Sequence, residues 1–213
     1  MARDRSPRTE RRHGPGCARR WRDDAVKEVI PVGAMSTVLQ EIERVVATMD
    51  EAEVDAFAGA VLALPRVFVT GEGRSGLMAR TFAMRLAHLG LAVAVVGETT
   101  TPPIRRGDGL VAVSGSGTTA VTRLIAEQAS EAGASVLAVT TDPDSPLARL
   151  ASRTPEVPAA TKWRRDGEPA TEQPLGSLFD QCAHVALDAV CLVIARRRGL
   201  DNERAREQHA NVE

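Results

Sequence analysis

The sequence lacks the features that mark secreted, membrane-spanning and nucleic-acid-binding proteins. Its three cysteines show no C-x-x-C spacing, so we expect buried free thiols in a reducing compartment. No stretch approaches the roughly 18 apolar residues of a membrane span, and the N-terminus lacks the apolar segment of a signal peptide. The formal net charge of -1 provides no basic field for nucleic acid or an anionic membrane. We therefore expect a cytoplasmic protein whose partners are small molecules or copies of itself.

The composition indicates one folded domain preceded by an arm. Of the 213 residues, 43% are hydrophobic, which is enough for one sizeable core. Residues 1–34 are dense in Arg, Pro and Gly and show no helical or strand periodicity, so we expect them to be disordered. A nucleic-acid-binding arm is an alternative, but acidic residues are interspersed and no aromatic ladder accompanies the arginines. Since Met35 begins a better-patterned sequence, a start site there is another alternative, and the domain is expected over residues 35–213.

The order of apolar patterns predicts the fold class. From Ser36 onward apolar residues recur at helical spacing, and Asp50 with Glu53 resembles the cap of a second helix. Strands are then predicted at 67–70, 91–96, 110–113 and 135–140, with a weak edge strand near Glu156. Helices are predicted at 76–89, 119–132, about 145–151, 175–197 and 202–209. This alternation favours a three-layer, doubly wound α/β domain with a five-stranded parallel sheet, flavodoxin-like in architecture.

Two loops rich in glycine and hydroxyl groups follow predicted strands. They read GEGRSG at residues 71–76 and SGSGTT at residues 114–119. Ligands of open parallel sheets bind beyond the carboxyl ends of the strands. Glycines allow backbone N–H groups to approach an anion, and the following helix directs its positive dipole end to the same place. One such loop is often an ordinary turn, whereas two at one sheet edge indicate a phosphate site.

The first loop also matches the dinucleotide pattern G-x-G-x-x-G. Glu98 follows the next strand at about the offset of a ribose-binding acid, so a dinucleotide-dependent oxidoreductase is an alternative. However, Arg74 and Ser75 occupy positions where small residues usually let a pyrophosphate approach, and a dinucleotide site does not require a second serine-rich loop. These features favour a smaller phosphorylated ligand.

Five strings resemble one known family over about residue 35 to the last residue. They read GEGRSGLMARTFAMRLAHLGLAVAVVGETTTP (71–102), VSGSGTT (113–119), TTDPDSPLARLA (140–151), QPLGSLFDQ (173–181) and HANVE (209–213). The chain resembles the sugar isomerase (SIS) fold and, within it, the 6-phospho-3-hexuloisomerases. The resemblance implies conversion of 3-hexulose 6-phosphate to fructose 6-phosphate, the second step of formaldehyde assimilation by the ribulose monophosphate route. It also implies a homodimer or homotetramer with sites near subunit interfaces.

The implied chemistry is proton transfer through an enediol, which requires no redox cofactor and no metal. By resemblance Ser75, Ser114, Ser116 and Thr118 hold the phosphate, together with Gly73 and Thr119 of the same loops. Arg74 is expected to neutralise the phosphate or the enediolate. Asp180 stands where related isomerases carry a glutamate base, because this chain reads FDQ where the family usually reads FEQ. Glu98 and residues 99–101, beginning with Thr99, are expected to line the sugar pocket, although a turn at the exit of the strand explains them nearly as well.

The histidines and the function class leave alternatives open. His88, in the string MRLAHLG, and His209, in the C-terminal string, are candidates for a catalytic role, although an interface histidine and a frayed terminus explain them as well. His184 lies one helical turn beyond Asp180 and either orients it or packs. A non-catalytic sugar-phosphate-binding SIS protein is an alternative function because Asp180 departs from the family. An isomerase of another sugar phosphate, such as arabinose 5-phosphate, is a further one.

Overall fold

The structure is a computed structural model that describes residues 33–209. The arm predicted for residues 1–34 lies outside the described residues, apart from its last two positions. Two helices come first, α1 (Ala34–Val46) and α2 (Glu51–Leu62). They precede β1 (Val67–Gly71), α3 (Gly73–His88), β2 (Val93–Val95), β3 (Gly109–Val113), α4 (Ala120–Glu131) and β4 (Ser135–Val139). The short 3-10 helix η1 (Ala148–Leu150), α5 (Ser177–Arg198) and α6 (Asn202–Glu207) complete the described part.

The four strands form one parallel sheet in the order β2-β1-β3-β4. Its register pairs Gly71 at the end of β1 with Val113 at the end of β3. The chain moves from β1 to β2 on one side and then to β3 on the other, so the switch point of this topology lies between β1 and β3. Both glycine-rich loops begin at these two strand ends, which places them side by side.

The prediction of a fifth strand is wrong, because no regular strand follows β4 in the described residues. Beyond β4, the described chain makes only isolated parallel bridges, Leu137 with Arg153 and Thr140 with Glu156. Pro155 and Pro158 flank the second bridge, and a proline has no N–H to donate to a ladder. The segment therefore follows the edge of the sheet without becoming a strand. The short helix expected at 145–151 is likewise reduced to η1.

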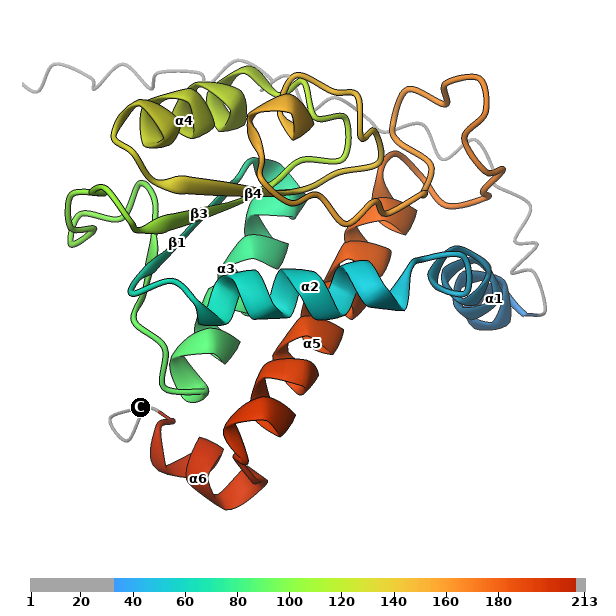
Figure 1. Cartoon of the computed structure of the whole chain (residues 1–213). Coiled ribbons are helices and arrows are strands. Elements are labelled where there is room, and N and C mark those ends of the chain that lie inside the picture. The colour runs from blue at the N-terminus through green and yellow to red at the C-terminus, as the bar shows by residue number, and fades with distance from the viewer. Residues whose placement is uncertain (1–32, 210–213) are drawn as a thin grey trace, which may run out of the picture. The chain divides into compact units, whose positions relative to one another are not determined.

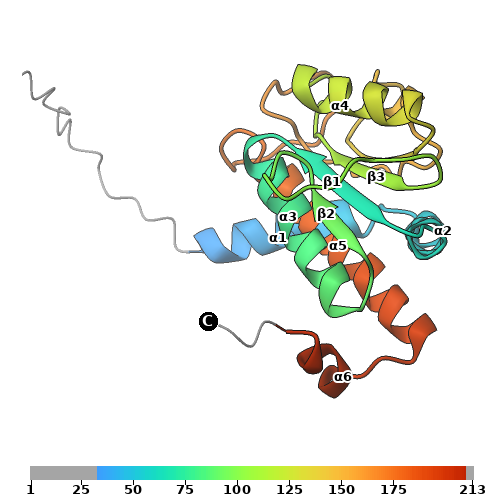
Figure 2. The same cartoon turned by 90° about the vertical axis from the view of Figure 1, so that its left-hand side faces the viewer.

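Helices cover both faces of the sheet, as the near-continuous apolar strands predict. Alternate strand residues divide between two cores: Val69 and Val111 pack with α2, α3 and α5, whereas Phe68 and Leu110 pack beneath α4. Figures 1 and 2 show this three-layer arrangement, with α4 on one side, joined there by the short η1, and α2, α3 and α5 on the other. Burial of a side chain of this size contributes about 1.5–3 kcal/mol, so the two cores fix the strand ends firmly.

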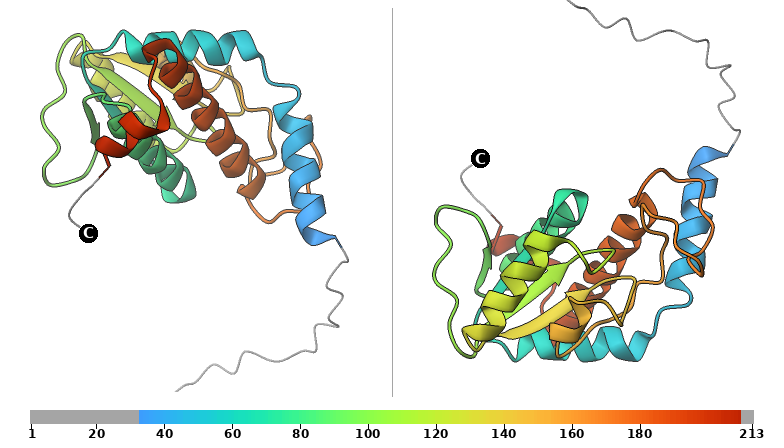
Figure 3. Two further views of the ribbon diagram at one scale, coloured as in Figure 1. Left: turned by 90° about the horizontal axis from the view of Figure 1, so that it is seen from below. Right: turned by 90° about the horizontal axis from the view of Figure 1, so that it is seen from above.

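Helix α5 is the central helix of the larger core. It packs against α2 and α3, and Figure 3 shows it running beside α3. By length and composition it is, among the described helices, the one that could span a membrane, so the expectation that no stretch approaches such a span is wrong on that test. It is nevertheless a core helix, since 56% of its most apolar 18-residue window is buried inside the domain. Its cysteines, Cys182 and Cys191, are buried free thiols as predicted, and burial raises the pKa of both to about 12. Cys17 lies outside the described residues.

Candidate active site

The loop after β1 is a tight turn that leads directly into α3. A side chain at Gly76 would place its Cβ 2.4 Å from the carbonyl oxygen of Gly71, so only glycine permits this approach. Gly73 has a φ of 58°, in the left-handed region that favours glycine. Glu72 is the N-cap of α3 and makes no side-chain capping hydrogen bond, which leaves the helix N-terminus without a side-chain cap. The helix begins three residues earlier than predicted, so Arg74 and Ser75 lie in its first turn.

The loop after β3 is equally constrained. Gly117 has a φ of 61°, and a Cβ there would lie 2.1 Å from Ser145 Oγ. The carbonyl of Gly115 accepts hydrogen bonds from Thr140 Oγ1, at 3.1 Å, and from Thr141 Oγ1, at 2.9 Å. These contacts fix the loop to the end of β4, so its hydroxyl groups are positioned by the sheet.

The hydroxyls of this loop form two pairs. Ser114 Oγ lies 3.0 Å from Thr119 Oγ1, and Thr118 Oγ1 donates to Ser116 Oγ at 3.0 Å. Each hydroxyl has one proton and two lone pairs, so it can turn its proton to an anion. Ser114 is buried beneath the loop, whereas Ser116 and Thr119 line the adjacent cavity.

The two loops meet at a cavity of about 330 Å³. Of the predicted residues it brings together Gly73, Arg74, Ser75, Ser116, Thr119 and Asp180. Its volume lies in the range of small-molecule sites, which begins at about 300 Å³. The cavity is lined by glycine loops, hydroxyl groups, the cations of Arg74 and Lys162 and the buried carboxylate of Asp180. These groups can bind a polar anionic ligand.

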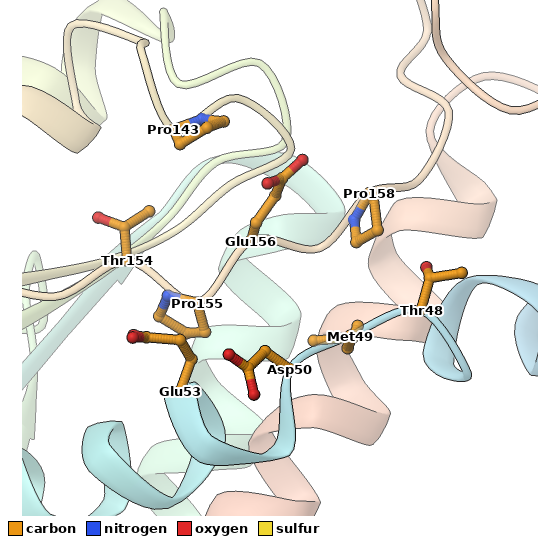
Figure 4. Close-up of a pocket in the computed structure, with 9 residues that line it drawn as sticks. All are labelled: Thr48, Met49, Asp50, Glu53, Pro143, Thr154, Pro155, Glu156 and Pro158. Atoms are coloured by element: carbon orange, nitrogen blue, oxygen red, sulfur yellow. The ribbon is translucent and has the colours of Figure 1, made fainter.

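A larger cavity, of about 470 Å³, lies at the start of α2 (Figure 4). The ionisable residues that line it are Asp50, Glu53 and Glu156, and no lysine or arginine is among its lining. Asp50 is engaged as the N-cap of α2, where it accepts a hydrogen bond from the backbone N–H of Ala52 at 2.8 Å. Because carboxylates repel an anion, we assign the phosphate to the smaller cavity despite the size difference.

Asp180 is the buried carboxylate of the site. It lies in the first turn of α5 with a side chain only 7% exposed, and it accepts hydrogen bonds from Arg74 Nε at 2.9 Å and Ser75 Oγ at 3.2 Å. Burial raises the pKa of Asp180, although these hydrogen bonds and the charge of Arg74 act in the opposite direction. A carboxylate with a raised pKa is a stronger base than an ordinary one. Asp180 as the base stays a prediction, and its burial and hydrogen bonds are the observations on which the proposal below rests.

Six other predicted residues are absent from the lining of this cavity in the single chain. Ser114 is buried beneath the second loop and Thr118 is exposed on it, and the remaining four are His88, His209, Glu98 and Thr99. His88, at the end of α3, stacks on His209, with ring centroids 4.9 Å apart and an interplanar angle of 27°. Burial lowers the pKa of His88, and the charges of His209 and Arg85 lower it further. Glu98 lines a separate cavity along β2 and forms an exposed ion pair with Arg80 at 2.8 Å. Thr99 is exposed beside Glu98.

His184 has contacts other than Asp180. Its Nδ1 lies 3.4 Å from Thr81 Oγ1, and its Nε2 lies 3.6 Å from the carboxylate of Asp188. The carboxylate of Asp180 has its hydrogen bonds from Arg74 and Ser75. The structure therefore favours packing over orientation of Asp180 as the role of His184.

The sequence pattern missed one wall of the cavity. Thr161, Lys162 and Trp163 line it, although residues 159–174 read only as a polar loop bounded by prolines. Gly176 and Phe179, at the start of α5, also line it. The available signal was composition, because the chain has only two lysines and two tryptophans and one of each is adjacent here.

Comparison with known proteins identifies the family of the chain. Residues 63–164 match the SIS domain model. The 3-hexulose-6-phosphate isomerase of Mycobacterium gastri is 44% identical, over 84% of this chain and 89% of that protein. The enzyme of the same name from Bacillus subtilis is 37% identical, over 84% of this chain and 97% of that protein.

Solved structures share the fold of the chain. The hypothetical protein MJ1247 of Methanococcus jannaschii, whose structure led to an inferred function of 3-hexulose-6-phosphate isomerase, has a TM-score of 0.73 and 29% identity. That match covers 84% of this chain and 98% of MJ1247. The sugar isomerase domain of an RpiR transcription factor from Sphaerobacter thermophilus has a TM-score of 0.66 and 21% identity, over 85% of this chain and 96% of that one, and supports the fold alone.

The fold and the paired loops thus define a SIS-domain protein of the sugar isomerase class. Within that class, the chain belongs to the family of the 3-hexulose-6-phosphate isomerases.

Proposed function

We propose that this chain is the isomerase that converts 3-hexulose 6-phosphate to fructose 6-phosphate. The observation that carries the proposal is the position of Asp180, a buried carboxylate facing two glycine- and hydroxyl-rich loops across one cavity. The curated relatives that bear this enzyme's name match most of the chain. The reaction is the second step of formaldehyde assimilation by the ribulose monophosphate route, as the resemblance implies.

The reaction moves one proton between neighbouring carbons. Asp180 removes the proton from C2, the C2–H electron pair forms the C2=C3 double bond, and the C3 carbonyl oxygen gains a proton. The resulting enediol is reprotonated at C3 while the C2 hydroxyl loses its proton and becomes the carbonyl. No atom is gained or lost, so the steps need a base, an acid and a held phosphate. We assign the phosphate to Ser75, Ser114, Ser116, Thr118, Thr119 and the backbone at Gly73.

The aspartate in place of the family's glutamate is compatible with this role. Asp180 reaches one methylene less far, yet Phe179 beside it packs against Gly115, where an added Cβ would lie 3.0 Å from the ring. This close contact holds the start of α5 against the second loop. A short carboxylate on a closely packed helix can therefore reach a substrate held between the two loops.

A second copy of the chain is the proposed macromolecular partner. Leu77 and Met84 of α3 are 56% and 51% exposed, and Leu192 of α5 is 51% exposed. The contact between Thr81 and His184 places the outer faces of the two helices side by side. Apolar side chains at helical spacing on adjacent helices form a face that a second copy can cover.

This arrangement gives the remaining predicted residues a role. We propose that His88, His209, Glu98 and Thr99, which lie outside the cavity of their own chain, complete the cavity of a neighbouring subunit. His88 lies one turn beyond Met84 on the same face of α3, consistent with a place at the subunit interface. We further propose a cytoplasmic enzyme without a nucleic-acid or membrane partner.

A coupled assay tests the function directly. Purified full-length protein is supplied with 3-hexulose 6-phosphate, and fructose 6-phosphate is read out by a coupling dehydrogenase. Arabinose 5-phosphate, with a readout of ribulose 5-phosphate, is the comparison substrate. Turnover of 3-hexulose 6-phosphate supports the proposal. Turnover of arabinose 5-phosphate alone would show that the enzyme is an isomerase of a different sugar phosphate. Binding of a sugar phosphate without turnover would show a non-catalytic sugar-phosphate-binding protein.

A further inference from the structure

Of the two cationic side chains that line the candidate active site, one is paired with a carboxylate and the other is left to neutralise the phosphate. Arg74 is the partner of Asp180, so these two charges largely cancel. Glu72 adds a negative charge at the rim, and Lys162 adds a positive one. A phosphate monoester carries about -1.5 to -2 charges at neutral pH, as phosphoserine does. Hydroxyls and backbone N–H groups supply hydrogen bonds to such a group but no net charge.

Lys162 differs from Arg74 in having no carboxylate partner within the part of the chain that the structure describes. Its Nζ lies 4.9 Å from the centroid of the Trp163 ring, a cation–π contact that leaves the ammonium free to donate hydrogen bonds. Both side chains are exposed, and both line the cavity. An ammonium with three donors at the mouth of an anion site is a suitable phosphate ligand.

The loop that carries Lys162 is held by its own charged residues. Arg164 adopts a φ of 49°, and its guanidinium donates to the carbonyl oxygens of Thr161, of Leu175 at 2.7 Å and of Gln173 at 2.5 Å. Glu168 accepts hydrogen bonds from the N–H and the hydroxyl of Thr161, at 2.8 and 2.7 Å. One guanidinium thus closes residues 161–175 into a loop and fixes the residue before Lys162.

The same loop is anchored to α1. Glu41, a buried residue of that helix, accepts hydrogen bonds from Thr171 Oγ1 at 2.6 Å, the N–H of Glu172 at 2.9 Å and Gln173 Nε2 at 3.0 Å. Burial raises the pKa of Glu41, but these hydrogen bonds outweigh it and the pKa is lowered, so the anchor is ionised at neutral pH. Figure 1 shows the loop between β4 and α5. Lys162 is therefore held in place at the cavity.

We propose that Lys162 is the phosphate-binding cation of this site, while Arg74 positions Asp180. This inference rests on the proposed function in that the ligand is a sugar phosphate. From the sequence, Arg74 is expected to neutralise the phosphate or the enediolate, whereas this inference gives neutralisation of the phosphate to Lys162.

The test uses the tryptophan beside Lys162 as a reporter. The chain has two tryptophans and no tyrosine, so Trp21→Phe leaves Trp163 as the sole strong emitter. The full-length Trp21→Phe protein is titrated with fructose 6-phosphate, inorganic phosphate and unphosphorylated fructose, and calorimetry measures the same affinities. We expect the two phosphates, but not fructose, to change Trp163 emission.

Three variants in this background isolate the charge of Lys162. Lys162→Gln and Lys162→Met should weaken binding of both phosphates by about 10- to 100-fold, since a hydrogen bond to a charged group is worth about 1.5–3 kcal/mol. Lys162→Arg should retain most of the affinity. Arg165→Gln is the matched control, because Arg165 is a cation of the same loop that pairs with Asp142 at 3.6 Å and lines a different cavity.

The outcomes separate this inference from the proposed function. If the parent protein binds neither fructose 6-phosphate nor inorganic phosphate, the sugar-phosphate function itself fails. If the parent binds both and the folded Gln and Met variants bind equally well, the role of Lys162 is wrong. If Arg165→Gln weakens binding as much as Lys162→Gln, the effect is general charge and not a phosphate contact. In turnover, Lys162→Gln should raise KM for the sugar phosphate more than it lowers kcat.

Discussion

Arg74 Nε donates a hydrogen bond to Asp180 Oδ2 at 2.9 Å, across a sequence separation of 106 residues. The contact joins the first turn of α3 to the first turn of α5, so one helix supplies the carboxylate and another sets its charge state. The pKa of Asp180 is determined by opposing effects, burial upward and Arg74 downward. The pH at which Asp180 ionises therefore depends on Arg74.

Removing Arg74 should move the pH dependence of turnover. Without the guanidinium, the pKa of Asp180 rises further. Because Asp180 must be ionised to act as a base, acidification then abolishes activity at a higher pH than in the wild type. We expect Arg74→Met to shift the acidic limb of the kcat profile upward by about one pH unit. Arg123→Met, which removes an exposed ion pair on α4, should leave the profile unchanged. An unshifted profile for Arg74→Met would show that the ion pair does not control the base.

Substitutions of Asp180 test the base itself. Asp180→Asn should abolish isomerisation but leave sugar-phosphate binding measurable by calorimetry, because an amide cannot accept the carbon-bound proton. Asp180→Glu should keep activity or raise it. A capping role would make Asn harmless, but the N-cap of α5 is Gly176, which makes no side-chain capping bond. Near wild-type kcat in the Asn variant would move the base elsewhere, with Glu98 and His209 to be tested next.

Ser116→Ala tests the phosphate loop. The phosphate is held similarly in the ground state and the transition state, so the variant should raise KM more than it lowers kcat. Loss of one hydrogen bond to a charged group is worth about 1.5–3 kcal/mol, or roughly 10- to 100-fold in KM. Ser130→Ala, on the exposed face of α4, is the matched control. Steady-state kinetics in which KM stays constant would mean that the anion lies elsewhere.

Turnover should survive exhaustive chelation. The enediol route requires no Lewis acid, and the described residues contain no group of three or more His, Cys, Asp or Glu side chains placed to hold a metal ion. The measurement is the isomerase rate after dialysis against EDTA, with and without added divalent ions. A loss of rate that a divalent ion restores would contradict the prediction.

Mixed oligomers test the subunit interface. If His88 serves a neighbouring cavity, chains with Asp180→Asn and chains with His88→Ala should restore one intact site when they assemble together. In a purified mixed dimer one of the two sites is intact, so the recovery approaches about half of the wild-type rate. The two chains are co-expressed with different tags, purified through both and assayed. Two differently tagged Asp180→Asn chains are the control, and the absence of recovery in the mixed pair would place His88 outside the neighbouring site.

Local patterns in the sequence were sufficient for the four strands that form and for the two loops. The runs at residues 67–70 and 110–113 are apolar throughout, so they predict buried parallel strands, and their carboxyl ends must share one edge of the sheet. Glycines at 71, 76 and 117 are needed where backbones approach closely or φ is positive, which is a local requirement visible in the chain. The string FDQ identified Asp180 because the residues around it are those of the family.

The tertiary structure decided what depends on contacts between distant residues. That Arg74 pairs with Asp180 follows from the packing of α3 on α5, which no local pattern encodes. Lys162 reaches the site because Arg164 closes its loop and Glu41, more than a hundred residues away, anchors it. The predicted fifth strand does not form because prolines near Glu156 lack the backbone N–H groups that a regular ladder with β4 requires. Apolar periodicity and glycine positions can be recognised in the sequence because they reflect local requirements of the backbone. Which charged residue pairs with which is decided only when helices and loops pack together.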